Sequence, residues 1–136
     1  MGNKPAYVLD SFALMAYLNV ESGTDRMINL LTQAKVGDCQ LLLCSINLGE
    51  ILYMVERRRG LSKAQQTQSL IESLPIQEIP AERSLILDAA HIKASHAISY
   101  SDAFVAALAI REQATIITGD PEFKSVESMV MVEWLT

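Results

Sequence analysis

Short apolar runs alternate along the chain with longer segments of helical periodicity, and this alternation leaves few possible folds. The sequence predicts strands at 6–9, 40–44, 76–79, 115–118 and 129–133. It predicts helices at 11–18, 25–35, 45–59, 63–73, 81–96 and 102–113. Strands separated by helices are typical of a parallel sheet with helices on its faces. We therefore expect an α/β sandwich with a central, mainly parallel sheet of about five strands.

Several predicted helix ends carry recognisable signals. Thr24 or Asp25 is predicted to cap the helix at 25–35, Ser45 the helix at 45–59, and Ser101 the helix at 102–113, because hydroxyl and carboxylate side chains accept hydrogen bonds from free helix N–H groups. Gly60 follows three arginines and is predicted to end the helix before it.

Length and composition favour one folded domain. A chain of 136 residues can bury a core of its own, so residues 1–136 are expected to form a single domain. Half of the residues are hydrophobic and 20% are charged, which is unlike a disordered chain. No segment has the roughly 18 apolar residues of a membrane span, and we expect a cytoplasmic protein without membrane contact. Cys39 and Cys44 belong to no metal or disulfide motif and are predicted to be buried thiols.

Four single acidic residues lie in or beside apolar segments that contain no base: Asp10, Glu50, Asp102 and Asp120. No Lys or Arg occurs at 6–24, 37–55, 95–109 or 113–122. A partly buried carboxylate without a partner is costly, so proteins pair it, protonate it or give it a metal ion. The sequence offers these four acids no local counter-charge.

The predicted topology brings the four acids together. Asp10 follows the first strand, Glu50 lies early in the helix after the second, Asp102 begins a helix, and Asp120 follows the fourth strand. In a parallel α/β sheet these places lie along the crevice at the carboxyl ends of the strands. Any one of these acids could be only a helix cap or a turn residue, but four unrelated caps need not share one edge. Oxygen ligands without His or Cys suit Mg²⁺ or Mn²⁺.

The net charge of the whole chain does not favour a nucleic-acid ligand, but the charge at the acidic cluster with bound metal ions would. The net charge of −5 does not suggest a nucleic-acid-binding protein. Two divalent ions in the acidic cluster would change it to −5 + 4 = −1, and the ions could face a phosphate. The run at 56–59 could follow an RNA backbone or meet an acidic partner, although solvated basic residues are also common at a helix C-terminus.

The residues around the acids resemble the successive motifs of PIN domains, most closely those of the toxins of VapBC toxin–antitoxin pairs. The resemblance covers essentially the whole chain, through segment 8–18, the helix that contains Glu50, and segments 99–104 and 118–123. It implies a three-layer α/β/α sandwich, Mg²⁺- or Mn²⁺-dependent cleavage of RNA, a homodimer, and inhibition by a VapB-like antitoxin.

The resemblance also implies roles for individual residues. Asp10, Glu50, Asp102 and Asp120 match the four acidic positions of the family, which are metal-binding and catalytic. Within this set we expect Asp10 and Asp102 as direct ligands, Glu50 as a ligand or water-positioning base, and Asp120 as a ligand to a weaker second site. The hydroxyls of Ser11 and Thr118 resemble the family's supporting groups, which orient carboxylates or waters.

Other functions are weighed against this prediction. An aspartyl-phosphate phosphatase needs a second acid two residues after the first, where this chain has Phe12, and no suitable lysine precedes Asp120. A nucleotide-binding regulator would carry GxGxxG or GxxxxGK[ST], and neither occurs. An RNA-processing PIN nuclease without an antitoxin and a non-catalytic PIN scaffold remain alternatives, although retention of all four acids argues against the scaffold.

Overall fold

A computed structural model describes residues 4–135 of the chain. Five strands are present among them, β1 (Ala6–Leu9), β2 (Gln40–Cys44), β3 (Gln77–Ile79), β4 (Thr115–Thr118) and β5 (Val132–Trp134). The α-helices are α1 (Ser11–Leu18), α2 (Thr24–Lys35), α3 (Ser45–Arg59), α4 (Leu61–Ser73), α5 (Arg83–Ser95) and α6 (Tyr100–Glu112), and a 3₁₀ helix, η1, spans Pro121–Val126.

The five strands form one sheet in the order β3-β2-β1-β4-β5, and every pair is parallel. The predicted mainly parallel sheet is therefore confirmed. The chain moves outward from β1 through β2 to β3 and then returns to the other side of β1 as β4. The strand order thus reverses between β1 and β4, and crevices for ligands form at the carboxyl ends of strands at such a switch point.

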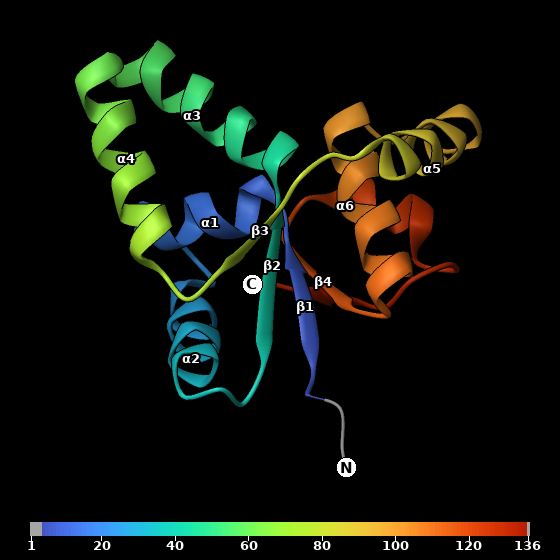
Figure 1. Cartoon of the computed structure of the whole chain (residues 1–136), viewed down its shortest axis with the longest axis horizontal. Helices are drawn as coiled ribbons and strands as arrows, with labels where there is room; N and C mark the ends of the chain where they lie inside the picture. Colours follow the sequence, from blue (N-terminus) through green and yellow to red (C-terminus); the bar gives the residue numbers. More distant parts are fainter. Residues whose placement is uncertain (1–3, 136) are drawn as a thin grey trace.

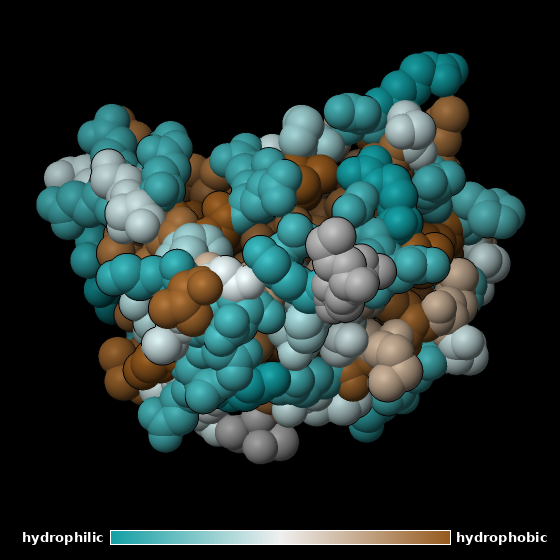
Figure 2. All heavy atoms as spheres, turned by 60° about the horizontal axis from the view of Figure 1, so that its bottom comes forward, coloured by the Kyte–Doolittle hydropathy of each residue, from teal (hydrophilic) through white to brown (hydrophobic). Residues whose placement is uncertain are grey.

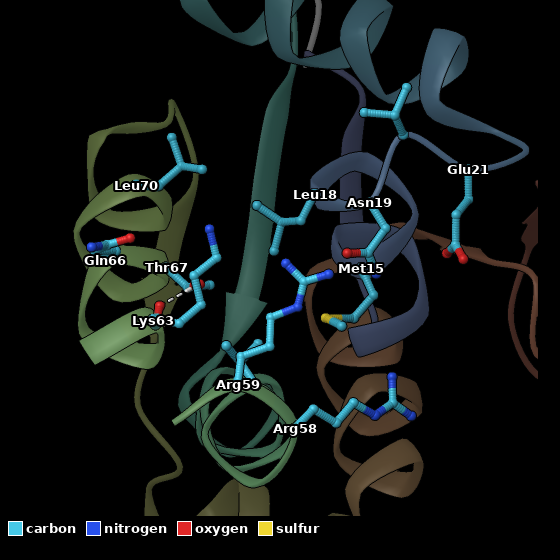
Figure 3. A pocket seen from close by; sticks show the side chains of 12 residues that line it. Met15, Leu18, Asn19, Glu21, Arg58, Arg59, Lys63, Gln66, Thr67 and Leu70 are labelled. Atoms are coloured by element: carbon cyan, nitrogen blue, oxygen red, sulfur yellow. Dashed lines mark hydrogen bonds between the residues drawn. The ribbon is translucent and has the colours of Figure 1, made fainter. Parts of the chain in front are cut away.

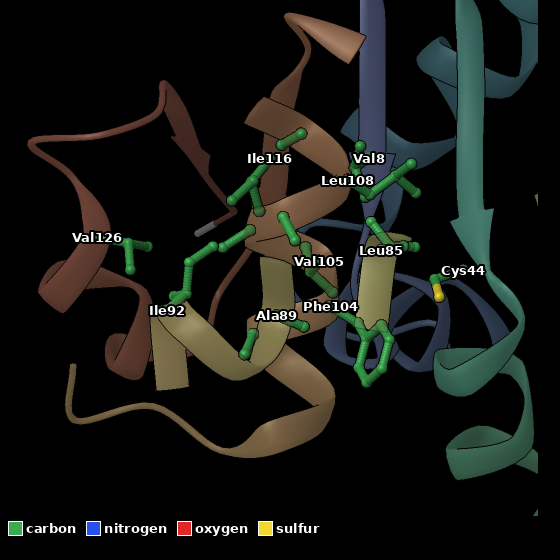
Figure 4. Close-up of a cluster of buried hydrophobic side chains, with 14 of the residues drawn as sticks. Val8, Cys44, Leu85, Ala89, Ile92, Phe104, Val105, Leu108, Ile116 and Val126 are labelled. Carbon is green, nitrogen blue, oxygen red and sulfur yellow. The ribbon is translucent and has the colours of Figure 1, made fainter. Parts of the chain in front are cut away.

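Helices cover both faces of the sheet, so the fold has the three layers expected (Figure 1). On one face α1 to α4 pack against side chains such as Leu9, Leu43 and Ile117. On the other face α5, α6 and η1 pack against Val8 and Ile116. Figure 4 shows this second cluster, in which side chains of α5 and α6 meet those of the strands. Because strand side chains alternate between faces, each buried strand contributes to both clusters.

The N-terminal caps of two helices differ from the prediction. Helix α2 begins after Gly23, at φ 94°, rather than after a capping Thr24 or Asp25. A β-carbon at Gly23 would lie 2.9 Å from Cβ of Leu135, so this close approach and the positive φ both require glycine. Helix α3 includes Ser45, which does not cap it; the Ser45 hydroxyl instead donates to Oε2 of Glu78 on β3 at 2.6 Å.

The last strand also begins later than expected. It was predicted at 129–133 and is observed at Val132–Trp134. The N–H groups of Met129 and Val130 both bond to the carbonyl of Val126, which closes the end of η1. These two residues are therefore used to terminate a 3₁₀ helix that the sequence pattern did not predict. Gly60 ends α3 as predicted, at φ 88°.

The surface is predominantly hydrophilic on the face brought forward in Figure 2, with apolar side chains in small groups. None of the helices within residues 4–135 is long and apolar enough to cross a membrane. Cys39 and Cys44 are both buried and free, as predicted.

Candidate metal centre

The four acids predicted from the sequence line one pocket of about 370 Å³. It lies at the carboxyl ends of β1 and β4, where the strand order reverses, and it is lined by α1, by one side of α3 from Glu50 to Arg58 and by the first turn of α6. Two further acids, Glu21 and Glu122, line the same pocket. The predicted convergence of Asp10, Glu50, Asp102 and Asp120 thus agrees with their positions in the structure, and each is held there by different contacts.

Asp10 is the most deeply buried of the acids, at 1% exposure. It caps α1, and its Oδ1 accepts the N–H of Ala13 at 2.8 Å. Its Oδ2 accepts the hydroxyl of Thr118. The Thr118 oxygen in turn accepts the N–H of Asp120 at 2.9 Å. Thr118 therefore fixes the carboxylate that follows β1 relative to the loop that follows β4.

Glu50 is oriented by two serine hydroxyls from other helices. Ser11, at the start of α1, donates to Oε1 of Glu50. Ser101, at the start of α6, donates to Oε2 at 2.9 Å. Ser11 contacts Glu50, and Thr118 contacts Asp10, so each of the two hydroxyls donates to a carboxylate.

Asp102 lies in the first turn of α6 and is 6% exposed. The helix is capped by Ser99, whose hydroxyl accepts the N–H of Asp102 at 3.2 Å, and not by Ser101 as predicted. The reason is that the helix begins two residues earlier, at Tyr100, while the Ser101 hydroxyl donates to Glu50.

Glu122 was not singled out from the sequence. Among residues 4–135, Asp102, Asp120 and Glu122 form the group of metal-ligating side chains whose oxygens all lie within 4.8 Å of one another. Oδ1 of Asp120 accepts the N–H of Glu122 at 2.9 Å, and Oε1 of Glu122 accepts the N–H of Ser99 at 2.7 Å. The available signal was a second acid two residues after Asp120, across a proline that can begin a helical turn.

Two further residues shape the pocket without having been predicted. Asn47 is fully buried, and its Nδ2 donates to the carbonyl of Ser101 at 3.2 Å, which joins the first turns of α3 and α6. Gly119 precedes Asp120 and packs against the ring of Phe12. A β-carbon at this position would lie only 2.2 Å from Cε1 of that ring. Only glycine lets Phe12 pack this closely beside the acids.

Burial and mutual repulsion raise the pKa of two of the carboxyls. Desolvation is the main cause for Asp10, whose pKa rises from 3.8 to about 7 despite the hydrogen bonds from Thr118 and Ala13. Desolvation again acts first on Asp102, followed by the charges of Asp10 and Asp120, and its pKa rises from 3.8 to about 8. Both carboxyls therefore lack a positive charge that would hold them ionised.

A divalent cation fits this set of donors. The ion pairs present in residues 4–135 join Arg26 to Glu133 and Arg111 to Glu112, so none reaches the pocket acids. The pocket offers carboxylate oxygens, some of them buried and repelling one another, and hard cations prefer such oxygen ligands. A bound Mg²⁺ or Mn²⁺ would supply the missing counter-charge and favour the ionised forms of Asp10 and Asp102.

The raised pKa values predict how the stability of the metal-free protein changes with pH. Between the unfolded value of 3.8 and the folded values of about 7 and 8, the folded state binds more protons than the unfolded chain. The free energy of unfolding therefore decreases as pH rises through this window, by about 1.4 kcal/mol for each pKa unit. Denaturant unfolding in chelator should show a metal-free protein that is a few kcal/mol less stable near pH 8 than near pH 5.

Asp102→Asn should weaken this pH dependence and stabilise the metal-free protein near pH 8, since it removes one charge from the repelling cluster. Asp88→Asn, at an exposed position of α5, is the matched control and should leave the dependence unchanged. A parent protein that gains stability between pH 5 and pH 8 would contradict the prediction.

The chain is therefore a three-layer α/β protein, and the carboxylate-lined pocket at its switch point is a candidate centre for a divalent metal. The chain belongs to the PIN-domain family: the model of that family matches residues 7–128. Among curated proteins, none matches it by sequence.

Solved structures with a similar fold include complexes of toxin–antitoxin pairs. VapBC2 from Rickettsia felis, bound to a DNA fragment from its promoter, is 20% identical with a TM-score of 0.77, over 96% of this chain and 99% of that one. DNA-bound VapBC from Salmonella typhimurium is 16% identical with a TM-score of 0.73, over 95% and 97%. VapC20 from Mycobacterium tuberculosis, a toxin that cleaves the sarcin-ricin loop, is 15% identical with a TM-score of 0.69, over 88% and 94%. At these identities the likeness establishes the fold.

Proposed function

We propose that the chain is a Mg²⁺- or Mn²⁺-dependent ribonuclease that hydrolyses RNA phosphodiester bonds and acts as the toxin of a type II VapBC toxin–antitoxin pair. The observation that carries the proposal is the pocket that is lined by six acidic residues without an ion pair to any base among residues 4–135. Membership of the PIN-domain family supports it, as does the likeness to VapC20 and to VapBC complexes.

In this proposal Asp10, Glu50, Asp102 and Asp120 hold the divalent ions, and Glu122 joins them because it lies with Asp102 and Asp120. Ions held there would stabilise charge on the scissile phosphate and the leaving oxygen and would activate water. The hydrogen bonds from Ser11 and Ser101 leave Glu50 oriented either to bind an ion or to accept a proton from the attacking water. Thr118 keeps Asp10 and the Asp120 loop at a fixed separation, so that the site is formed before substrate binds.

The proposed partner is a VapB-like antitoxin, because the similar structures include complexes of such pairs. The homodimer implied by the family resemblance stays a prediction. A PIN nuclease that processes RNA without an antitoxin would use the same carboxylates, so the partner and the chemistry need separate tests.

The chemistry is tested first by cleavage of a mixed-sequence, single-stranded RNA with metals added and removed. We expect cleavage in Mg²⁺ or Mn²⁺, loss of cleavage in excess chelator, and recovery when Mn²⁺ is restored, because the chain's own carboxylates cannot provide the positive charge that the phosphate requires. DNA of the same sequence serves as the substrate control. Undiminished cleavage in excess chelator would rule out the proposed chemistry.

A further inference from the structure

A second hollow, larger than the acidic pocket, lies between α3, α4 and the end of α1. Its volume is about 740 Å³, against about 370 Å³ for the acidic pocket. Arg58 and Arg59 reach it from the last turn of α3, and Lys63 from the first turn of α4 (Figure 3). Figure 3 shows Arg59 and Lys63 directed into the space between α4 and α1. We name this hollow, lined by these three residues, the basic groove.

The three cations of the basic groove form no ion pair with residues 4–135. All three are exposed, and neither of the two ion pairs formed within residues 4–135 involves them. Glu21 is the acidic residue of the lining, so the groove carries a net charge of 3 − 1 = +2. That sign is opposite to the net charge of −5 of the whole chain. The groove is therefore a local positive surface on an acidic protein.

The basic groove continues into the acidic pocket. Met15, Asn19, Glu21 and Arg58 line both hollows. On α3, Glu50, Met54 and Arg58 follow one another at intervals of four residues and all line the acidic pocket, so they form one stripe of the helix. The eight residues from Glu50 to Arg58 correspond to about 12 Å along the helix axis. Arg58 thus stands within a short distance of the carboxylates, at the entrance to the groove.

We propose that the basic groove binds the phosphates of single-stranded RNA that flank the bond to be cut. This inference rests on the proposed ribonuclease function, which places the scissile phosphate at the carboxylates. A strand leaving that site along α3 meets Arg58 and then Arg59 and Lys63, and a positive groove that follows the backbone is the usual way to hold a single strand. The regularly spaced phosphates of an RNA strand can pair with the three cations, which form no ion pair with residues 4–135. The alternative ligand of the groove is an acidic segment of a partner protein.

The test compares two variants with the same change in charge. The groove variant carries Arg58→Gln, Arg59→Gln and Lys63→Gln. The control variant carries Arg57→Gln, Arg83→Gln and Lys93→Gln; Arg57 stacks on Tyr53 at 5.3 Å, Arg83 and Lys93 are on α5, and none of the three lines the basic groove. Circular dichroism and thermal melting establish that both variants fold.

Binding is measured by fluorescence anisotropy with a labelled single-stranded RNA in chelator, so that no cleavage occurs. The groove variant should bind RNA about tenfold more weakly than the control. The slope of log K against log salt concentration should become smaller by about two, since three phosphate contacts on a single strand contribute about 0.7 each. In Mn²⁺ it should show a KM raised about tenfold with kcat within about twofold, because the groove holds the substrate in the ground state and the transition state alike.

The outcomes separate the two proposals. If the parent cleaves RNA while the groove variant binds and cleaves as the control does, the groove assignment is wrong and the nuclease assignment stands. If no form of the protein cleaves RNA in Mn²⁺ but the difference in RNA binding persists, the nuclease assignment is wrong and the groove is an RNA-binding site. Unchanged RNA binding together with weaker binding of a protein inhibitor would overturn the groove as an RNA site and assign it to that partner.

Discussion

Asp102→Asn should abolish metal-dependent RNA cleavage, with kcat lowered on the order of a thousandfold, the equivalent of about 4 kcal/mol of transition-state stabilisation. Asp102 is 6% exposed and is the residue that the structure groups with both Asp120 and Glu122. An amide in its place keeps the shape of the side chain but removes a full negative charge from the proposed cation site. Single-turnover cleavage of a labelled RNA in Mn²⁺ measures the effect.

A second measurement shows whether the loss is due to the metal site. Bound metal stabilises a folded protein by linkage, so Mn²⁺ should raise the melting temperature of the parent and should raise that of Asp102→Asn far less. Asp88→Asn on α5 removes the same charge from an exposed position and should match the parent in both assays. An Asp102→Asn protein that keeps the parent's rate and its response to Mn²⁺ would show that Asp102 is not a ligand.

The acids could be located from the sequence because two independent patterns coincide. Each acid lies in a segment without bases, and the alternation of strands and helices puts Asp10 and Asp120 after strands that turn out to be neighbours. The parallel topology then carries both to the same edge of the sheet. No knowledge of side-chain packing is needed for this inference.

Glu122 could not be assigned from these patterns, because its position depends on contacts across the fold. Its carboxylate is directed toward Asp102 by the N–H of Ser99, which is 23 residues earlier in the chain. The caps were mispredicted for a related reason. Ser101 and Ser45 have the right chemistry for a helix start, but Glu50 and Glu78 take their hydroxyls. Tertiary hydrogen bonds thus override local propensity.

The basic groove could be predicted from the sequence only in part, unlike the four acids, which were located, and Glu122, which was not. The run of three arginines is obvious in the sequence, yet a helix C-terminus favours such residues whatever their function. What separates Arg58 and Arg59 from Arg57 is the face of α3 that packs toward α1 and α4, and that face is set by the helix arrangement. The sequence therefore identifies the charge, while the fold identifies its neighbours.

We expect a partner protein to silence the proposed ribonuclease by placing an Arg or Lys against the acidic cluster. The hypothesis follows from electrostatics, since the pocket acids have no ion pair within residues 4–135 and the pKa values of Asp10 and Asp102 are raised to about 7 and about 8. A guanidinium can pair with two carboxylates and supply the charge that a metal would supply, without activating water. We therefore expect inhibition to weaken as Mn²⁺ increases.

Calorimetric titration of a cognate inhibitor into the metal-free protein tests this mode. Asp10→Asn, Asp102→Asn and Asp120→Asn together should weaken binding by roughly a few kcal/mol, because buried charge-assisted contacts are lost. The parent should also bind more tightly near pH 8 than near pH 6, since a guanidinium favours the ionised carboxyls and binding at the lower pH must first release protons from Asp10 and Asp102. Equal affinity of the inhibitor for the triple variant and the parent would place the inhibitory contact away from the acids.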